Sequence, residues 1–257
     1  NMTMRYMRTI TIMIVTAFAV AFTPARAQAQ STPALWHIDQ GDAQVYLFGT
    51  VHLLPPNTSW QSARLKALVK QADSLTLEVE DDPSIAPEIQ KFTLQNGLYP
   101  PGQSLSAAIG VDEFEQVKKV SEKVGLPPQA LQAMRPWLAA LSLTLQYAQA
   151  QGFQVDAGAE AWLTHEFKSR DKSILGLEDP LVALGSVANH GDDVQKAMLL
   201  DTVEQLKDGG SVLGDLHDTW LKGDVEALEA SLLDPLMEQE ALFQSVLIDR
   251  NQNWTPK

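Results

Sequence analysis

The residues best suited to chemistry lie in Gly49-Thr50-Val51-His52. The preceding Val45-Tyr46-Leu47-Phe48 predicts a buried strand. A histidine just past such a strand is held rigidly beside the crevice where α/β proteins bind ligands, so His52 suits a metal ligand or a general base. Gly49 has no Cβ, so we expect backbone or ligand to approach closely there. The alternative is a structural histidine that hydrogen-bonds a neighbouring loop.

Glu78 is the second candidate, near the end of an alternating segment, residues 74–80, that predicts another strand. A helix beginning near residue 58 or 59 separates the two strands, which favours parallel pairing with a right-handed crossover. That pairing would bring Glu78 to the edge of the sheet that carries His52. Imidazole and carboxylate bind divalent ions such as manganese, cobalt or zinc, so we predict His52 and Glu78 as catalytic residues and metal ligands. Glu78 is either a ligand or the base that accepts a proton.

The remaining candidate residues are weaker as metal ligands or catalytic groups. Gly214-Asp215-Leu216-His217 repeats the Gly-x-x-His spacing in a polar helical stretch, so His217 is discounted as a ligand. Arg135, before a helix, either clamps a substrate carboxylate or pairs with an acid, and pairing is favoured. A surface or cross-strand position is predicted for His37, a solvated acidic loop for Glu80 and a turn for His190. His165 does not fit the helical zinc-protease pattern, because Ser169 stands where the second histidine is needed. No Gly-x-Ser-x-Gly or phosphate-binding glycine loop is present, and with no cysteine a cysteine nucleophile is impossible.

The elements that position these residues form a mixed α/β chain. Leu35-Trp36-His37-Ile38 and the strand before Gly49 predict a hairpin with a polar turn. Beyond Pro83 the pattern is mostly helical, interrupted by a short strand at residues 173–178. The predicted fold is therefore a mixed α+β class, with a small mixed β-sheet and a large helical portion.

The N-terminus predicts export. Residues 1–27 have a basic start, an apolar run of about 13 residues and a small-residue cleavage site after Ala27, as a signal peptide does. Their removal would change the net charge from −13 to −16, which repels nucleic acid and anionic lipid. No later segment approaches the ~20 apolar residues of a membrane span. Without cysteine there is no disulfide or lipid attachment, so the Gram-negative periplasm is the expected location.

Several blocks of the chain together resemble one family, the bacterial TraB/GumN proteins, whose animal relatives include the Tiki metalloproteases. The matching blocks are Leu35-Trp36, residues 46–52, residues 77–80, Arg135-Pro136-Trp137, Val155-Asp156, Gly176-Leu177-Glu178, Trp220 with Gly223-Asp224, and Arg250-Asn251. The resemblance covers essentially the whole mature chain, residues 28–257.

The resemblance implies a metal-dependent hydrolase-like fold whose active site combines two Gly-x-x-His motifs and a glutamate. His52 carries over as the first histidine and Glu78 as the glutamate. The second motif is expected beyond Lys257, so the chain is interpreted as a fragment missing its C-terminal strands. The predicted function is a periplasmic metal-dependent hydrolase acting on peptides or proteins. The alternative is a non-catalytic periplasmic binding or assembly factor linked to envelope polysaccharide.

Overall fold

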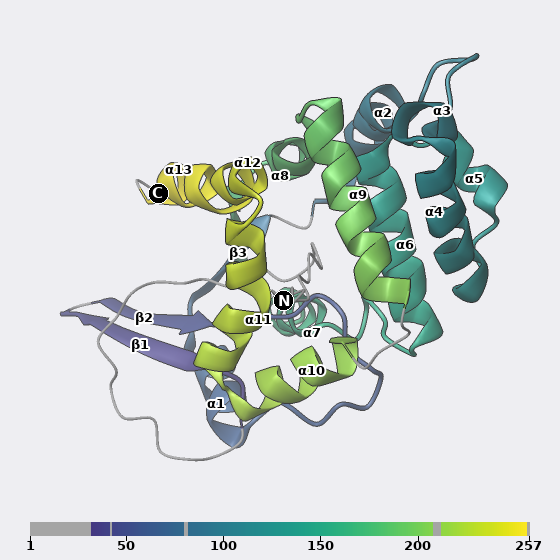
Figure 1. Cartoon of the computed structure of the whole chain (residues 1–257). Coiled ribbons are helices and arrows are strands. Elements are labelled where there is room, and N and C mark those ends of the chain that lie inside the picture. Colours follow the sequence, from purple (N-terminus) through teal and green to yellow (C-terminus); the bar gives the residue numbers. More distant parts are fainter. Residues whose placement is uncertain (1–31, 42, 80–81, 208–211, 256–257) are drawn as a thin grey trace.

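The computed structural model describes residues 32–41, 43–79, 82–207 and 212–255 (Figure 1). The predicted signal peptide, residues 1–27, lies outside these ranges, as do Glu80 and Asp81. Small sheets combine with many helices, which confirms the mixed α+β class.

The predicted hairpin is confirmed. Strand β1 (Leu35–Gln40) pairs antiparallel with β2 (Ala43–Phe48), and Leu35 lies opposite Phe48. Gly41 takes the left-handed conformation in the turn, at φ +74°, and donates its amide to Asp39 Oδ1 at 3.0 Å. The hairpin projects from the helices (Figure 1), and the first four residues of β2 are exposed rather than buried as predicted.

The predicted parallel pairing between the strand before His52 and the strand of Glu78 is wrong. In the described residues β3 (Ser74–Val79) pairs in parallel with β4 (Ser173–Glu178), and β2 pairs with β1 alone. The fold therefore has two separate two-stranded sheets in place of one mixed sheet. The tight turn lets β2 pair with the strand directly before it, while helix α7 (Ala159–Lys168) packs against both β3 and β4 and brings them together.

Helices make up most of the described chain. They are α1 (Ala63–Gln71), α2 (Ala86–Gly97), α3 (Leu105–Ile109), α4 (Val111–Lys123), α5 (Pro128–Gln132), α6 (Pro136–Ala150), α7 (Ala159–Lys168), α8 (Pro180–Ala188), α9 (Asp192–Lys207), α10 (Val212–Lys222), α11 (Val225–Met237), α12 (Glu240–Phe243) and α13 (Asp249–Trp254), with a 3-10 turn at Pro83–Ile85 and a π-helical turn at Gln244–Ile248. None of the helices in these ranges is both long and apolar enough to cross a membrane.

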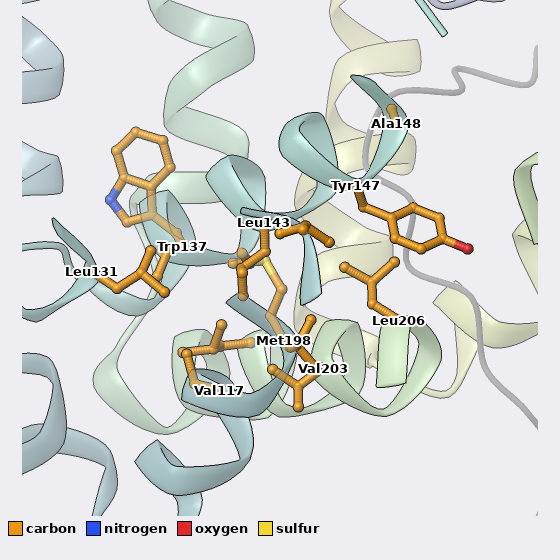
Figure 2. Packing of buried hydrophobic residues seen from close by; sticks show 14 of the residues in the cluster. Val117, Leu131, Trp137, Leu143, Tyr147, Ala148, Met198, Val203 and Leu206 are labelled. Atoms are coloured by element: carbon orange, nitrogen blue, oxygen red, sulfur yellow. The ribbon is translucent and has the colours of Figure 1, made fainter. Parts of the chain in front are cut away.

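The main core lies between α6, α9 and α4. Leu143 of α6 packs beside Met198 and Val203 of α9, with Val117 of α4 next to them (Figure 2). The buried residues of helix α6 lie on one broad face, and the residues of its other face up to Gln146 are half-buried, which is typical of a helix covered on several sides. Leu53, next to His52 in the chain, also belongs to this core.

A second apolar cluster lies under the segment that carries His52. Its aromatic members are Phe48, Trp60, Trp162, Phe167 and Trp220, and Leu54 is fully buried there. The cluster joins α1, α7, α10 and the end of β2 into one packed unit. Packing of this density fixes the backbone that leaves β2, because close-packed interiors resist small displacements.

Candidate functional site

His52 is held by a carboxylate from α7. Its Nδ1 lies 2.6 Å from Glu160 Oε2, and the two side chains are 34% and 22% exposed. The hydroxyl of Thr50 donates to the other oxygen, Glu160 Oε1, at 2.9 Å. One carboxylate therefore fixes both side chains of the Gly49–His52 corner.

The backbone of the corner contacts the start of α7. The Ala159 amide donates to Val51 O at 2.9 Å. A Cβ on Gly158 would collide with the His52 carbonyl group, coming within 2.6 Å of its carbon. Glu160 reaches His52 because Gly158 allows this close approach.

The close backbone approach predicted at Gly49 is not seen in the described residues, and a close approach by a ligand there stays a prediction. A Cβ on Gly49 would meet Ala34 O and the Trp36 ring at 3.9 Å, which is ordinary contact. The constraint lies at Gly158, on the partner segment.

Glu160 also changes the protonation of His52. Burial lowers the pKa of His52, but the hydrogen bond and charge of Glu160, with the charge of Glu78, outweigh burial and raise that pKa above 6.5 despite the opposing charge of Arg250. Burial raises the pKa of Glu160, but the bonds from His52 and Thr50 outweigh it and bring that pKa below 4.5. The pair therefore favours its charged form.

Glu78 belongs to a second group of charges centred on Arg250 of α13. Arg250 Nη2 lies 3.1 Å from Glu78 Oε2, and Arg250 Nε donates to Glu178 Oε1 at 2.7 Å. Nη2 also contacts Glu178 Oε1, and the guanidinium stacks on Trp254 at 4.8 Å. Arg250 and Glu178 are each 8% exposed. Arg250 thus joins the ends of β3 and β4 to the last described helix.

The two groups together carry excess negative charge. In the described ranges three acids, Glu78, Glu160 and Glu178, pair with two basic side chains, Arg250 and the charged form of His52, so the acids outnumber the bases. Glu178 Oε2 is buried and has no hydrogen-bond partner in the described ranges. A buried carboxylate oxygen without a partner is uncommon and indicates a place where a cation or donor is needed.

A family model decides which proteins this chain is related to. The model of the TraB/PrgY/gumN family matches residues 34–257. The chain belongs to this family. It is 21% identical over 235 residues to the uncharacterized protein YbaP of Escherichia coli (strain K12), covering 90% of this chain and 84% of that protein. YbaP of Shigella flexneri matches with the same identity and coverage. No solved structure matches.

Family membership confirms the resemblance seen in the sequence blocks. In this TraB/PrgY/gumN chain His52 and Glu78 lie in one electrostatically connected region, since the charge of Glu78 acts on His52. They arrive there from different sheets rather than from neighbouring strands. Their roles as ligands and catalytic residues stay predictions.

Three residues of the candidate site were not predicted as site residues from the sequence: Glu160, Glu178 and Arg250. Glu160 stands in the first turn of α7, where acidic residues are also common for reasons of helix stability. Glu178 ends β4 and lies beside Val79 in the parallel register, so the rule that selected Glu78 applies to it equally. Arg250 was noticed only as part of a matching block.

The histidine of the second Gly-x-x-His segment, His217, contacts its neighbour in sequence and two residues far along the chain. On α10, His217 Nδ1 lies 3.0 Å from Asp218 Oδ1, Nε2 lies 3.5 Å from Thr58 Oγ1, and the ring meets Phe153 edge-on. The described ranges contain no group of three or more histidine, aspartate or glutamate side chains placed to hold a metal.

The side chains of Arg135, His37 and His190 make contacts that a structural role explains. The Arg135 guanidinium lies over the Tyr99 ring at 4.9 Å, and the favoured ion pair with an acid is not seen in the described residues. The aromatic face takes the place of the acid. His37 stacks on Tyr46 across the hairpin, which confirms its cross-strand role. His190 Nε2 lies 2.9 Å from Ser186 O, a carbonyl that only accepts, so this nitrogen carries a proton and is not a base.

Proposed function

We propose that this protein is a metal-dependent hydrolase that cleaves peptide bonds. The observation that carries the proposal is the contact between Glu160 and His52 Nδ1. When His52 is neutral, the Glu160 carboxylate keeps the ring proton on Nδ1 and leaves the other nitrogen, Nε2, as the electron donor, so a bound ion would displace the Nε2 proton of the charged form. Metal-binding histidines are commonly held in this way.

The donor set fits a divalent ion in chemistry and in charge. His52 Nε2 has no hydrogen-bond partner within the described ranges, and Glu78 supplies a carboxylate in the same charged region. A manganese, cobalt or zinc ion would add positive charge in a region where the acidic side chains outnumber the basic ones. His52 and Glu78 are two ligands, so water and substrate would complete the coordination and the ion would exchange readily.

The protein's own residues would prepare the site for hydrolysis. Glu160 and Thr50 hold the imidazole in one orientation, and Arg250 fixes the Glu78 carboxylate. A bound divalent ion would polarise the scissile carbonyl and lower the pKa of a water toward ~7. Glu78 would serve either as a ligand or as the base whose carboxylate oxygen accepts the proton of that water.

The first test is hydrolysis of a peptide mixture, followed by mass spectrometry, with manganese, cobalt or zinc added. We expect cleavage by the wild type and by His37→Ala, since His37 lies on the projecting hairpin, and none by His52→Ala. Cleavage by His52→Ala at the wild-type rate would contradict the proposal.

The alternative function is a non-catalytic binding factor. It would be favoured if the wild type cleaved no peptide and if a partner were recovered from envelope extracts both with and without chelator.

We also propose that the protein works in the periplasm, on the strength of residues 1–27. Expression in a Gram-negative host and mass spectrometry of each cell fraction test this. A periplasmic chain beginning at Gln28 is expected, and a cytoplasmic chain that keeps residues 1–27 would contradict it.

A further inference from the structure

Helix α10 reaches the His52 corner through a single side chain. Trp220 is 2% exposed, and its Nε1 donates to Gly49 O at 2.8 Å. Gly49 is the first residue of the segment that ends in His52. A residue far along the chain therefore fixes the point at which this segment leaves β2.

The indole nitrogen of Trp220 donates a hydrogen bond that the packing of the apolar cluster does not require. The Trp220 ring packs against Trp60 at 5.5 Å and meets Phe48 edge-on at 6.5 Å. Trp162 packs on Trp60 in the same cluster, at 5.3 Å. Phenylalanine could fill most of either space, but it could not donate to Gly49 O. The hydrogen bond is thus separable from the packing.

The turn after α10 packs against the segment just before β1, which in turn bonds Gly49. Gly223 has φ +66°, and a Cβ there would lie within 3.6 Å of the Thr32 carbonyl carbon and closer still to its oxygen. The Gly49 amide in turn donates to Ala34 O at 3.1 Å. The end of α10 therefore contacts the chain both before β1 and after β2.

We propose that Trp220 is a positioning residue for His52. The corner is held at Gly49 by α10 and at Val51 and His52 by α7, and both contacts are needed to keep the imidazole in place. The inference rests on the proposed function only in taking His52 as the reacting histidine. The proposal assigns a physical role to Trp220 and Gly223, which form one of the sequence blocks that resemble the family.

The test compares Trp220→Phe with Trp162→Phe, the same change in the same cluster without the bond to Gly49. Imidazole ¹⁵N resonances are recorded on the whole chain, and His52 is assigned by its loss in His52→Ala. We expect wild-type His52 signals in Trp162→Phe, and shifted or exchange-broadened signals in folded Trp220→Phe. Manganese affinity should fall about tenfold in Trp220→Phe alone, as for other residues that orient a ligand.

The outcomes separate this proposal from the proposed function. Wild-type His52 signals in folded Trp220→Phe would overturn the positioning role, whatever the metal affinity. If the wild type binds no manganese, the metal hypothesis fails, but the resonance comparison still tests Trp220.

If Trp220→Phe does not fold, hydrogen exchange of the wild type decides. The Trp220 indole N–H and the Ala159 amide, bonded to opposite ends of the corner, should lose protection in one opening event. Separate openings would overturn the proposal.

Discussion

At the scale of single residues, the site depends on a close approach that only one glycine permits. We expect Gly158→Ala to lower the free energy of unfolding by about 1–3 kcal/mol, because the new Cβ meets the His52 carbonyl group. Gly49→Ala is the matched control, since its Cβ would find ordinary contacts at 3.9 Å. Urea denaturation of both variants measures the difference. Equal losses would contradict the placement of α7 against the corner.

The His52–Glu160 pair predicts a pH dependence of stability in the metal-free protein. The pKa of Glu160 is lowered from 4.5, so its contribution is present above 4.5 and is lost as pH falls through the lowered value. The pKa of His52 is raised from 6.5, so its contribution is complete below 6.5 and is lost as pH rises through the raised value.

The stabilisation by the pair should therefore be largest between about pH 4.5 and 6.5. The measurement is the free energy of unfolding of the wild type minus that of Glu160→Gln across pH 3 to 9. A difference that does not vary with pH would contradict the pairing.

At the scale of elements, a lysine joins the end of one helix to the start of a strand. Lys172 Nζ donates to Lys70 O and Ala72 O at 2.6 Å each and to Val69 O at 3.2 Å, so it caps the C-terminus of α1. We expect Lys172→Met to lower the free energy of unfolding by about 1–2 kcal/mol. Lys66→Met, an exposed site on α1, should change it by less than about 0.5 kcal/mol. A similar small effect for both would show that the cap contributes nothing.

The elements also show where sequence reasoning succeeds. The hairpin was predictable because its turn chemistry, Asp39 to Gly41, lies within the segment itself. The strand at residues 173–178 was predictable from its alternation and length. Its pairing with β3 was not, because the two segments lie about a hundred residues apart and nothing local encodes the partner. Glu160 was missed for the same reason, since its link to His52 depends on how α7 packs.

At the scale of the whole molecule, Arg250 connects the C-terminal helix to both strands of the parallel sheet. Arg250→Met would leave Glu78 and Glu178 without their shared cation, so we expect a loss of about 3–5 kcal/mol in unfolding free energy. Arg170→Met is the control, because its i,i+4 pair with Glu166 is partly exposed and is worth about 0–1 kcal/mol. Denaturant unfolding of both variants tests this. If Arg250→Met lowered the free energy of unfolding by less than Arg170→Met does, the buried ion pairs of Arg250 would not stabilise the packing of α13.

The central claim is that His52 and Glu78 hold a divalent ion, and calorimetric titration with manganese tests it most directly. Wild type and His37→Ala should bind one ion with the same affinity, while His52→Ala and Glu78→Gln should each lose that binding. Binding by His52→Ala that equals the wild type would contradict the account.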